Sequence, residues 1–149
     1  MNLNRSIQND RVMETNHSNG DSLAQVTDAN NLAITSLAKL DHIVWKVNTY
    51  RSVLEGESIF EVVDCHHCRL AKWYYERDGQ ASFAHTPSYR MLEAPHATVH
   101  RSTERVLDLL SASISTNDTA IAESLEEMEK GSEQVLQVLD QIILQNKGH

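Results

Sequence analysis

Apolar residues follow a helical period along most of the chain. From residue 22 to residue 56 they recur every seven positions, at Val26, Ala33, Leu40, Val47 and Leu54. Leu23, Leu37 and Val44 occupy interleaved positions of the same stripe. This pattern predicts one long amphipathic helix. We expect it to end near Gly56, because glycine readily adopts the conformation that stops a helix.

Three later segments have the same three-or-four spacing of apolar positions. A second helix is expected within residues 59–76, before the sequence RDGQ. A third begins between Tyr89 and His96, with Ser88 as a possible cap, and a fourth follows the turn sequence SASISTND. The cap candidates for the fourth helix are Thr116, Asn117 and Asp118. Four helices with short connections predict an all-α fold, a four-helix bundle.

The first 21 residues differ from the rest in composition. They are rich in Asn, Ser and charged residues and contain few large apolar side chains. Such a segment buries too little surface to offset the entropy lost on ordering. We therefore predict a disordered leader over residues 1–21 and a bundle domain over residues 22–146.

Charge and hydropathy exclude several classes of partner. The formal net charge is −8 and no cluster of Lys and Arg interrupts it, so nucleic acid is not an expected partner. No apolar run reaches the roughly 18 residues of a membrane span, and the N-terminus lacks a secretory signal. We expect a cytoplasmic protein without a membrane segment. In a reducing compartment, two cysteines three apart are thiols, metal ligands or a transient redox pair rather than a structural disulfide.

Histidines and cysteines are the candidate functional residues. His96 and His100 are four apart on one predicted helix, so both imidazoles can reach one metal ion. The alternative is a hydrogen-bonded core histidine beside a solvated one. Cys68 and His42 lie on other predicted helices, where a buried cysteine is usually an inert small side chain. Spacing alone does not bring ligands together from three helices.

Three motifs, LDHIVWK, DCHHCRLAKWYYE and PHATVH, together resemble the chemoreceptor zinc-binding (CZB) domain family. This family is found attached to bacterial soluble chemoreceptors and to diguanylate cyclases, and the similarity covers about residues 37–110. The resemblance implies that Zn²⁺ is bound by His42, Cys68, His96 and His100. It also makes Asp64 a partner that tunes a ligand. Ala71 stands where the family usually has Gly, and Cys65 adds a C-x-x-C outside the ligand pattern.

The function implied by the resemblance is regulation, not enzymatic catalysis. Zinc occupancy, or loss of zinc through oxidation, would change helix packing and thereby chemotaxis or cyclic-di-GMP output through a chemoreceptor or cyclase partner. Homodimerisation is implied as well, with the apolar stripe of the first helix as the expected interface. Cys65 would modulate the site, because it could resolve an oxidised Cys68 as a disulfide.

Three other functions are compatible with single features of the sequence. A zinc hydrolase requires an open coordination position and a general base, and the motif H-E-x-x-H is absent. A C-x-x-C thiol oxidoreductase is disfavoured if the two cysteines lie within a continuous helix. A di-iron bundle would require more paired His and carboxylate motifs than these helices carry.

Overall fold

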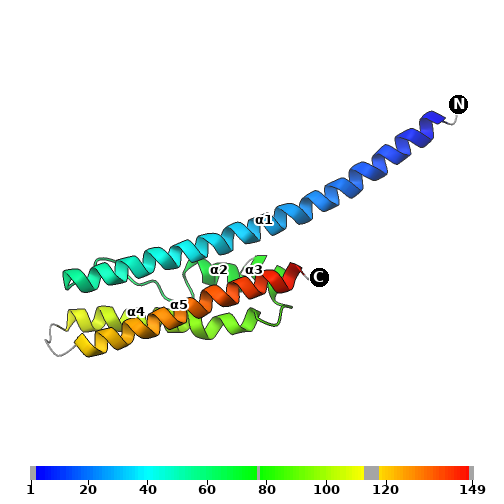
Figure 1. Cartoon of the computed structure of the whole chain (residues 1–149). Coiled ribbons are helices and arrows are strands. Elements are labelled where there is room, and N and C mark those ends of the chain that lie inside the picture. The colour runs from blue at the N-terminus through cyan, green and yellow to red at the C-terminus, as the bar shows by residue number, and fades with distance from the viewer. Residues whose placement is uncertain (1–2, 77, 113–117, 148–149) are drawn as a thin grey trace. The chain divides into compact units, whose positions relative to one another are not determined.

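A computed structural model of the chain describes residues 3–76, 78–112 and 118–147, and all regular structure in them is helical (Figure 1). The α-helices are α1 (Leu3–Glu55), α2 (Arg69–Glu76), α3 (Asp78–Phe83), α4 (Glu93–Ser111) and α5 (Asp118–Lys147), with a 3₁₀-helix η1 (Tyr89–Leu92) before α4. None of these residues forms a β-strand. The predicted all-α fold is therefore confirmed.

Helix α1 ends as predicted but begins earlier. It stops at Glu55, and Gly56 follows with a positive φ of 74°, the left-handed conformation that glycine adopts without strain. Residues 3–21 are helical, whereas a disordered leader was predicted. This stretch has no proline and a single glycine, so no backbone break interrupts the helix there. The chain divides into two compact units, Met1–Ala33 and Ile34–His149, and the site described below lies in the second unit.

The predicted second helix is much shorter than the sequence suggested. Residues 57–68 are irregular, and α2 begins only at Arg69. In this segment the Oδ1 atom of Asp64 accepts a hydrogen bond from the backbone N–H of His66 at 2.7 Å, and the Asp64 carbonyl accepts one from the N–H of His67 at 2.9 Å. An Asp side chain that bonds its own turn competes with helix formation. Cys68 consequently lies just before α2, not within a helix.

The third and fourth predicted helices are close to the observed ones. Helix α4 starts inside the predicted interval, and Pro95 is its third residue, where a missing N–H costs little. The short helix α3 lies between the predicted second and third helices and was not predicted from the sequence. Ser88 precedes η1 but forms no cap; it bonds Gln145 of α5 instead. Asp118 is the first residue of α5, and the other two cap candidates, Thr116 and Asn117, lie outside the described residues.

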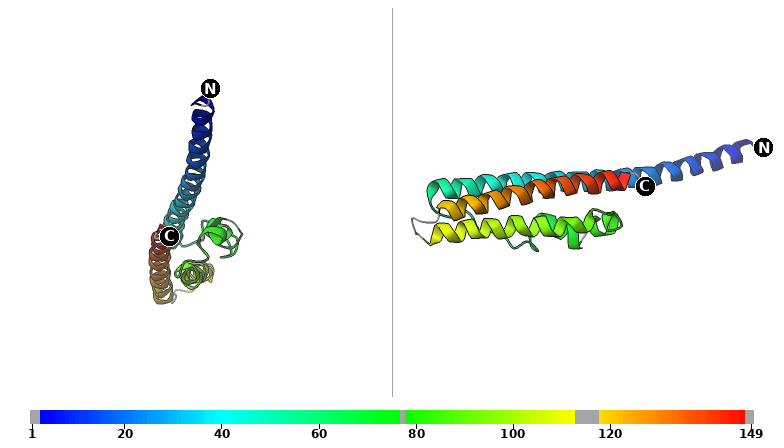
Figure 2. Two further views of the ribbon diagram at one scale, coloured as in Figure 1. Left: turned by 90° about the vertical axis from the view of Figure 1, so that its right-hand side faces the viewer. Right: turned by 60° about the horizontal axis from the view of Figure 1, so that its bottom comes forward.

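Within residues 34–149, the last part of α1 runs beside α4 and α5 (Figure 2). Lys46 of α1 pairs with Glu129 of α5 at 2.9 Å, and Lys39 pairs with Asp140, so the two helices are antiparallel. Gly131 lies where α5 approaches the start of α4. A Cβ there would be 3.1 Å from the carbonyl oxygen of Pro95, tighter than ordinary contact. This close approach packs α5 against the turn of α4 that carries His96.

The core of this unit contains side chains from all its helices. Its largest fully buried members include Trp73, Phe83, Leu92, Met128, Leu139 and Ile142. No helix in the described part of the chain is both long enough and apolar enough to cross a membrane.

Candidate metal centre

Three donor atoms from distant parts of the chain meet at one place. The Nε2 atoms of His96 and His100 are 3.1 Å apart, and the Sγ atom of Cys68 is 3.2 Å from Nε2 of His96. All three donor atoms lie within 4.8 Å of one another. The two histidines are only 5% and 4% exposed. We refer to Cys68, His96 and His100 as the buried triad.

Local structure explains the position of each donor. His96 and His100 are one turn apart on α4, so their rings are in contact edge to face, with centroids 4.7 Å apart. Cys68 lies at the start of α2, where backbone N–H groups have no partner within the helix. The N–H of Ala71 points at the sulfur, 3.4 Å from Sγ. This arrangement directs the sulfur toward α4 and offers it hydrogen bonds that favour a thiolate.

A backbone carbonyl fixes the orientation of His100. Its Nδ1 atom lies 2.7 Å from the carbonyl oxygen of Val63, which can only accept a hydrogen bond. Nδ1 therefore carries the proton, and the lone pair remains on Nε2, the atom that faces His96. Histidines that bind metals commonly donate their other ring N–H in this way. The irregular segment before α2 thus prepares one donor of the triad.

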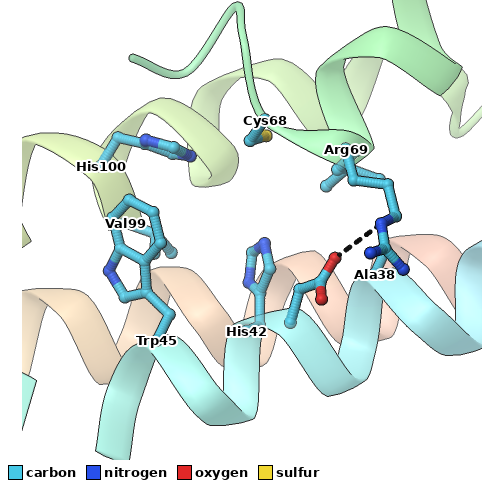
Figure 3. A pocket seen from close by; sticks show the side chains of 9 residues that line it. Ala38, His42, Trp45, Cys68, Arg69, Val99 and His100 are labelled. Carbon is cyan, nitrogen blue, oxygen red and sulfur yellow. Dashed lines mark ion pairs between the residues drawn. The ribbon is translucent and has the colours of Figure 1, made fainter. Parts of the chain in front are cut away.

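His42 lies across a small pocket from the triad. Its ring projects from α1 toward Cys68 (Figure 3), and its centroid is 6.0 Å from that of His96. Together with Cys68 and His100 it lines a pocket of about 40 Å³. His42 is 8% exposed, and its Nδ1 atom is buried without a hydrogen-bond partner. The structure therefore brings three of the four predicted ligands together and places the fourth facing them, outside the tight group.

Burial keeps these imidazoles neutral. Burial is the main cause and the charge of His100 the next, and together they lower the pKa of His42 to about 4 and that of His96 to about 3. Burial also lowers the pKa of His100, against the opposing hydrogen bond to Val63. For Cys68 the dominant effect is burial, which raises the pKa of the thiol despite the nearby N–H groups. At neutral pH the site therefore offers neutral imidazoles, the form that binds metal, and one thiol proton for a metal to displace.

The donor set fits a tetrahedral zinc ion. With Zn–N near 2.0–2.1 Å and Zn–S near 2.3 Å, neighbouring donors of a tetrahedron are about 3.3–3.6 Å apart. The observed 3.1 and 3.2 Å are close to these separations. A buried imidazole nitrogen without a partner is also costly unless it binds something, so Nδ1 of His42 fits a fourth donor.

Side chains next to the proposed ligands connect the helices that carry them. Arg69 follows Cys68, and its Nε atom lies 3.2 Å from Oδ2 of Asp41, the residue before His42 (Figure 3). Trp45 packs on His100 with centroids 4.6 Å apart, and its indole N–H donates to Thr103 at 2.8 Å. Asp41 and Arg69 were not singled out from the sequence. The one feature of the sequence that could have indicated them is that each is next to a predicted ligand within a motif.

The two predicted modulating residues lie on the outer side of this site. Asp64 is exposed, and its carboxylate accepts the hydrogen bond from the N–H of His66, which lowers the pKa of the acid. Cys65 is half-buried beside it. The group that holds a triad ring is thus the carbonyl of Val63, one residue before Asp64. Direct tuning of a ligand by Asp64 stays a prediction.

Comparison with known proteins identifies the type of domain. Residues 42–107 match the family model described as the chemoreceptor zinc-binding domain. The matched stretch contains every proposed ligand, the second and third motifs in full, and the first motif from His42 onward. No curated protein and no solved structure matches the chain. The resemblance noted from the sequence motifs is therefore confirmed over these residues, and so is zinc as the metal.

Proposed function

Because residues 42–107 form a zinc-binding domain of the chemoreceptor type, we propose that this chain is a regulatory zinc sensor whose ligands are His42, Cys68, His96 and His100. The observation that carries the proposal is the buried triad, in which a thiol and two imidazoles from separate segments come within 4.8 Å. Four protein donors fill a tetrahedral zinc ion and leave no position for a reacting water. Such a site favours regulation over catalysis.

His42 makes the metal site sensitive to helix packing. The triad belongs to α4 and the start of α2, whereas His42 is the only proposed ligand on α1. Zinc bound by all four residues would stabilise the arrangement in which α1 is held against α4. A ligand shifts a conformational equilibrium only by its difference in affinity for the two states. Here the difference in affinity comes from the bond between zinc and His42, which forms only when α1 is held against α4. Zinc occupancy would therefore control the position of α1.

The exposed side of α1 offers a route to an output. Leu37, Leu40, Val44 and Val47 are between 43% and 53% exposed and lie on the predicted seven-residue stripe. A stripe of this period suits pairing with another helix. We propose that it pairs two copies of the chain. A chemoreceptor or a diguanylate cyclase would be the signalling partner, with chemotaxis or cyclic-di-GMP synthesis as the output.

An oxidant is a second signal that this site could accept. The half-buried sulfur of Cys68 would be oxidised to a sulfenic acid by a peroxide, which is reduced in the step. The thiol of Cys65, three residues earlier, would then attack that sulfur and release water, forming a disulfide. The first step removes the thiolate ligand, and the disulfide formed in the second step keeps Cys68 from binding zinc again until it is reduced. The position of both thiols in one irregular segment, rather than in a rigid helix, supports this proposal.

Ligand substitution combined with metal analysis tests the sensor. Purified protein should hold zinc that survives dialysis, and chelation should lower its helicity or change its oligomeric state. Cys68→Ser and His96→Ala should lose this zinc and become insensitive to the chelator. His42→Ala should bind zinc more weakly while retaining the triad. His67→Ala is the matched control, because His67 is an exposed histidine outside the triad. Retention of the tightly bound zinc by Cys68→Ser would refute the proposed ligand set.

A further inference from the structure

The turn before α2 carries a second group of metal-binding side chains. The carboxylate of Asp64, the thiol of Cys65 and the imidazole of His66 place their donor atoms within 4.8 Å of one another. Asp64 and His66 are exposed and Cys65 is half-buried, so this group faces solvent. None of its members belongs to the buried triad. We refer to these three residues as the outer group.

The turn itself holds the outer group in place. The two hydrogen bonds that Asp64 accepts, from the N–H groups of His66 and His67, fix the backbone of three successive residues. The His66 ring packs against Tyr75 of α2 with centroids 5.4 Å apart, which restrains its side chain. A carboxylate oxygen, a thiolate sulfur and an imidazole nitrogen are all established zinc donors. Three donors on one restrained turn form a ready chelate.

The outer group adjoins the buried triad. The backbone connects the two groups. Val63, whose carbonyl accepts the hydrogen bond of His100, directly precedes Asp64, and Cys68 follows Cys65 by three residues. The triad histidines are at most 5% exposed, so a hydrated zinc ion cannot reach them without losing its water.

We propose that Asp64, Cys65 and His66 form a second, exposed zinc site that captures the ion and passes it to the buried site. On capture, the sulfur of Cys65 loses its proton and bonds zinc. During transfer, the bond from zinc to Cys65 breaks as the bond to Cys68 forms, and the proton released by the Cys68 thiol is taken up at Cys65. The inference builds on the proposed buried site, but it concerns different residues and a separate equivalent of metal.

A zinc titration of the metal-stripped full chain, in competition with a chromophoric chelator, tests this proposal. Wild type should bind two equivalents, the second more weakly than the first. His66→Ala should weaken binding of the second equivalent by more than about tenfold, because losing even a hydrogen-bonding partner of a metal ligand costs about that much and His66 is proposed as a ligand itself. The first equivalent should keep its affinity. In stopped-flow mixing, zinc should reach the buried site more slowly in His66→Ala than in wild type.

The control is His67→Ala, which removes an exposed histidine from the same turn but not from the outer group. It should match wild type in both measurements. Cobalt(II) offers a second readout, because the thiolate-to-metal absorption of the second equivalent should disappear in Cys65→Ser. A single equivalent in wild type, an equal effect of His66→Ala and His67→Ala, or an unchanged loading rate would each overturn the proposal. If His66→Ala lost the first equivalent of zinc, the proposed buried site would be refuted instead, because His66 is not one of its ligands.

Discussion

Zinc binding should release unusually few protons, because the proposed ligands are buried before the metal arrives. Burial holds the pKa of His42 at about 4 and that of His96 at about 3. Both imidazoles are then neutral at pH 6, so each can bind zinc through its free ring nitrogen without releasing a proton. The pKa of His100 is also lowered, whereas that of Cys68 is raised. The thiol is therefore the main source of the protons that zinc displaces.

The expected count differs clearly from that of an exposed site. At pH 6 an ordinary histidine with a pKa near 6.5 is about three-quarters protonated, so three of them and one thiol would release about 3.3 protons. In this site Cys68 releases about one proton, and His100 adds less than about 0.8. The prediction for the first equivalent of zinc is thus between about 1 and 1.8 protons. Acidification from pH 8 to 6 should weaken zinc binding mainly through the thiol, about tenfold per pH unit.

Titration calorimetry in several buffers measures this number directly. At pH 6 the observed heat should vary with the ionisation enthalpy of the buffer, and the slope gives the protons released per zinc. Cys68→Ser should lose the heat of this first equivalent altogether, because the variant lacks the proposed thiolate ligand. His67→Ala should leave the slope unchanged, since this histidine is exposed and lies outside the proposed ligand set. A release of three or more protons would show that the imidazoles are hydrated in the metal-free protein, and the buried pocket would be refuted.

Two further predictions concern residues that join the helices around the site. Asp41→Asn breaks the ion pair with Arg69 and should speed zinc release to an excess of chelator by up to about fivefold, because an exposed ion pair contributes at most about 1 kcal/mol. The control Glu55→Gln breaks the ion pair with Arg51, far from the ligands. Equal release rates in the two variants would show that Asp41 does not hold the site closed. Trp45→Phe keeps a ring beside His100 but removes the hydrogen bond to Thr103, so urea unfolding should report a loss of about 1 kcal/mol with zinc stoichiometry unchanged.

Hydrophobic periodicity predicted the long helices well and failed at one segment. In α4 and α5 most positions of the long apolar stripes are buried, so the pattern and the structure agree. Residues 59–63 have a similar spacing, but the segment is only five residues long and contains three β-branched side chains. The Asp64 side chain then bonds its own turn and the helix does not form. A hydrophobic pattern indicates which side chains are buried. It does not show that a side chain such as that of Asp64 competes with the helix for backbone hydrogen bonds.

The same irregular segment changes the setting of the two cysteines. A thiol oxidoreductase is disfavoured when Cys65 and Cys68 lie within a continuous helix. They instead lie in an irregular segment just before a helix, a common setting for reactive thiols. Burial nevertheless raises the pKa of both thiols, which opposes reactivity in the metal-free protein. The case for regulation therefore depends on zinc, which binds sulfur as thiolate whatever the pKa of the free thiol.

The identity of the proposed ligands was accessible from sequence only through the motifs, and their distances were not accessible at all. Spacing predicted the pairing of His96 with His100, because both lie on one helix. It could not reveal the Val63 carbonyl that orients His100, since any residue has that group. Nor could it predict that His42 faces the triad from outside. Side-chain distances between helices depend on packing, which a linear pattern does not contain.

The position of His42 gives the site its asymmetry. If all four donors were already in contact, zinc would add stability without favouring one arrangement of α1 over another. The triad is assembled in the described structure, whereas His42 faces it across the pocket with an unpaired buried nitrogen. If His42 binds the metal as proposed, the helix α1 that carries it would shift toward the triad. The free energy of this one bond would then be coupled to α1, the helix whose outer stripe is exposed.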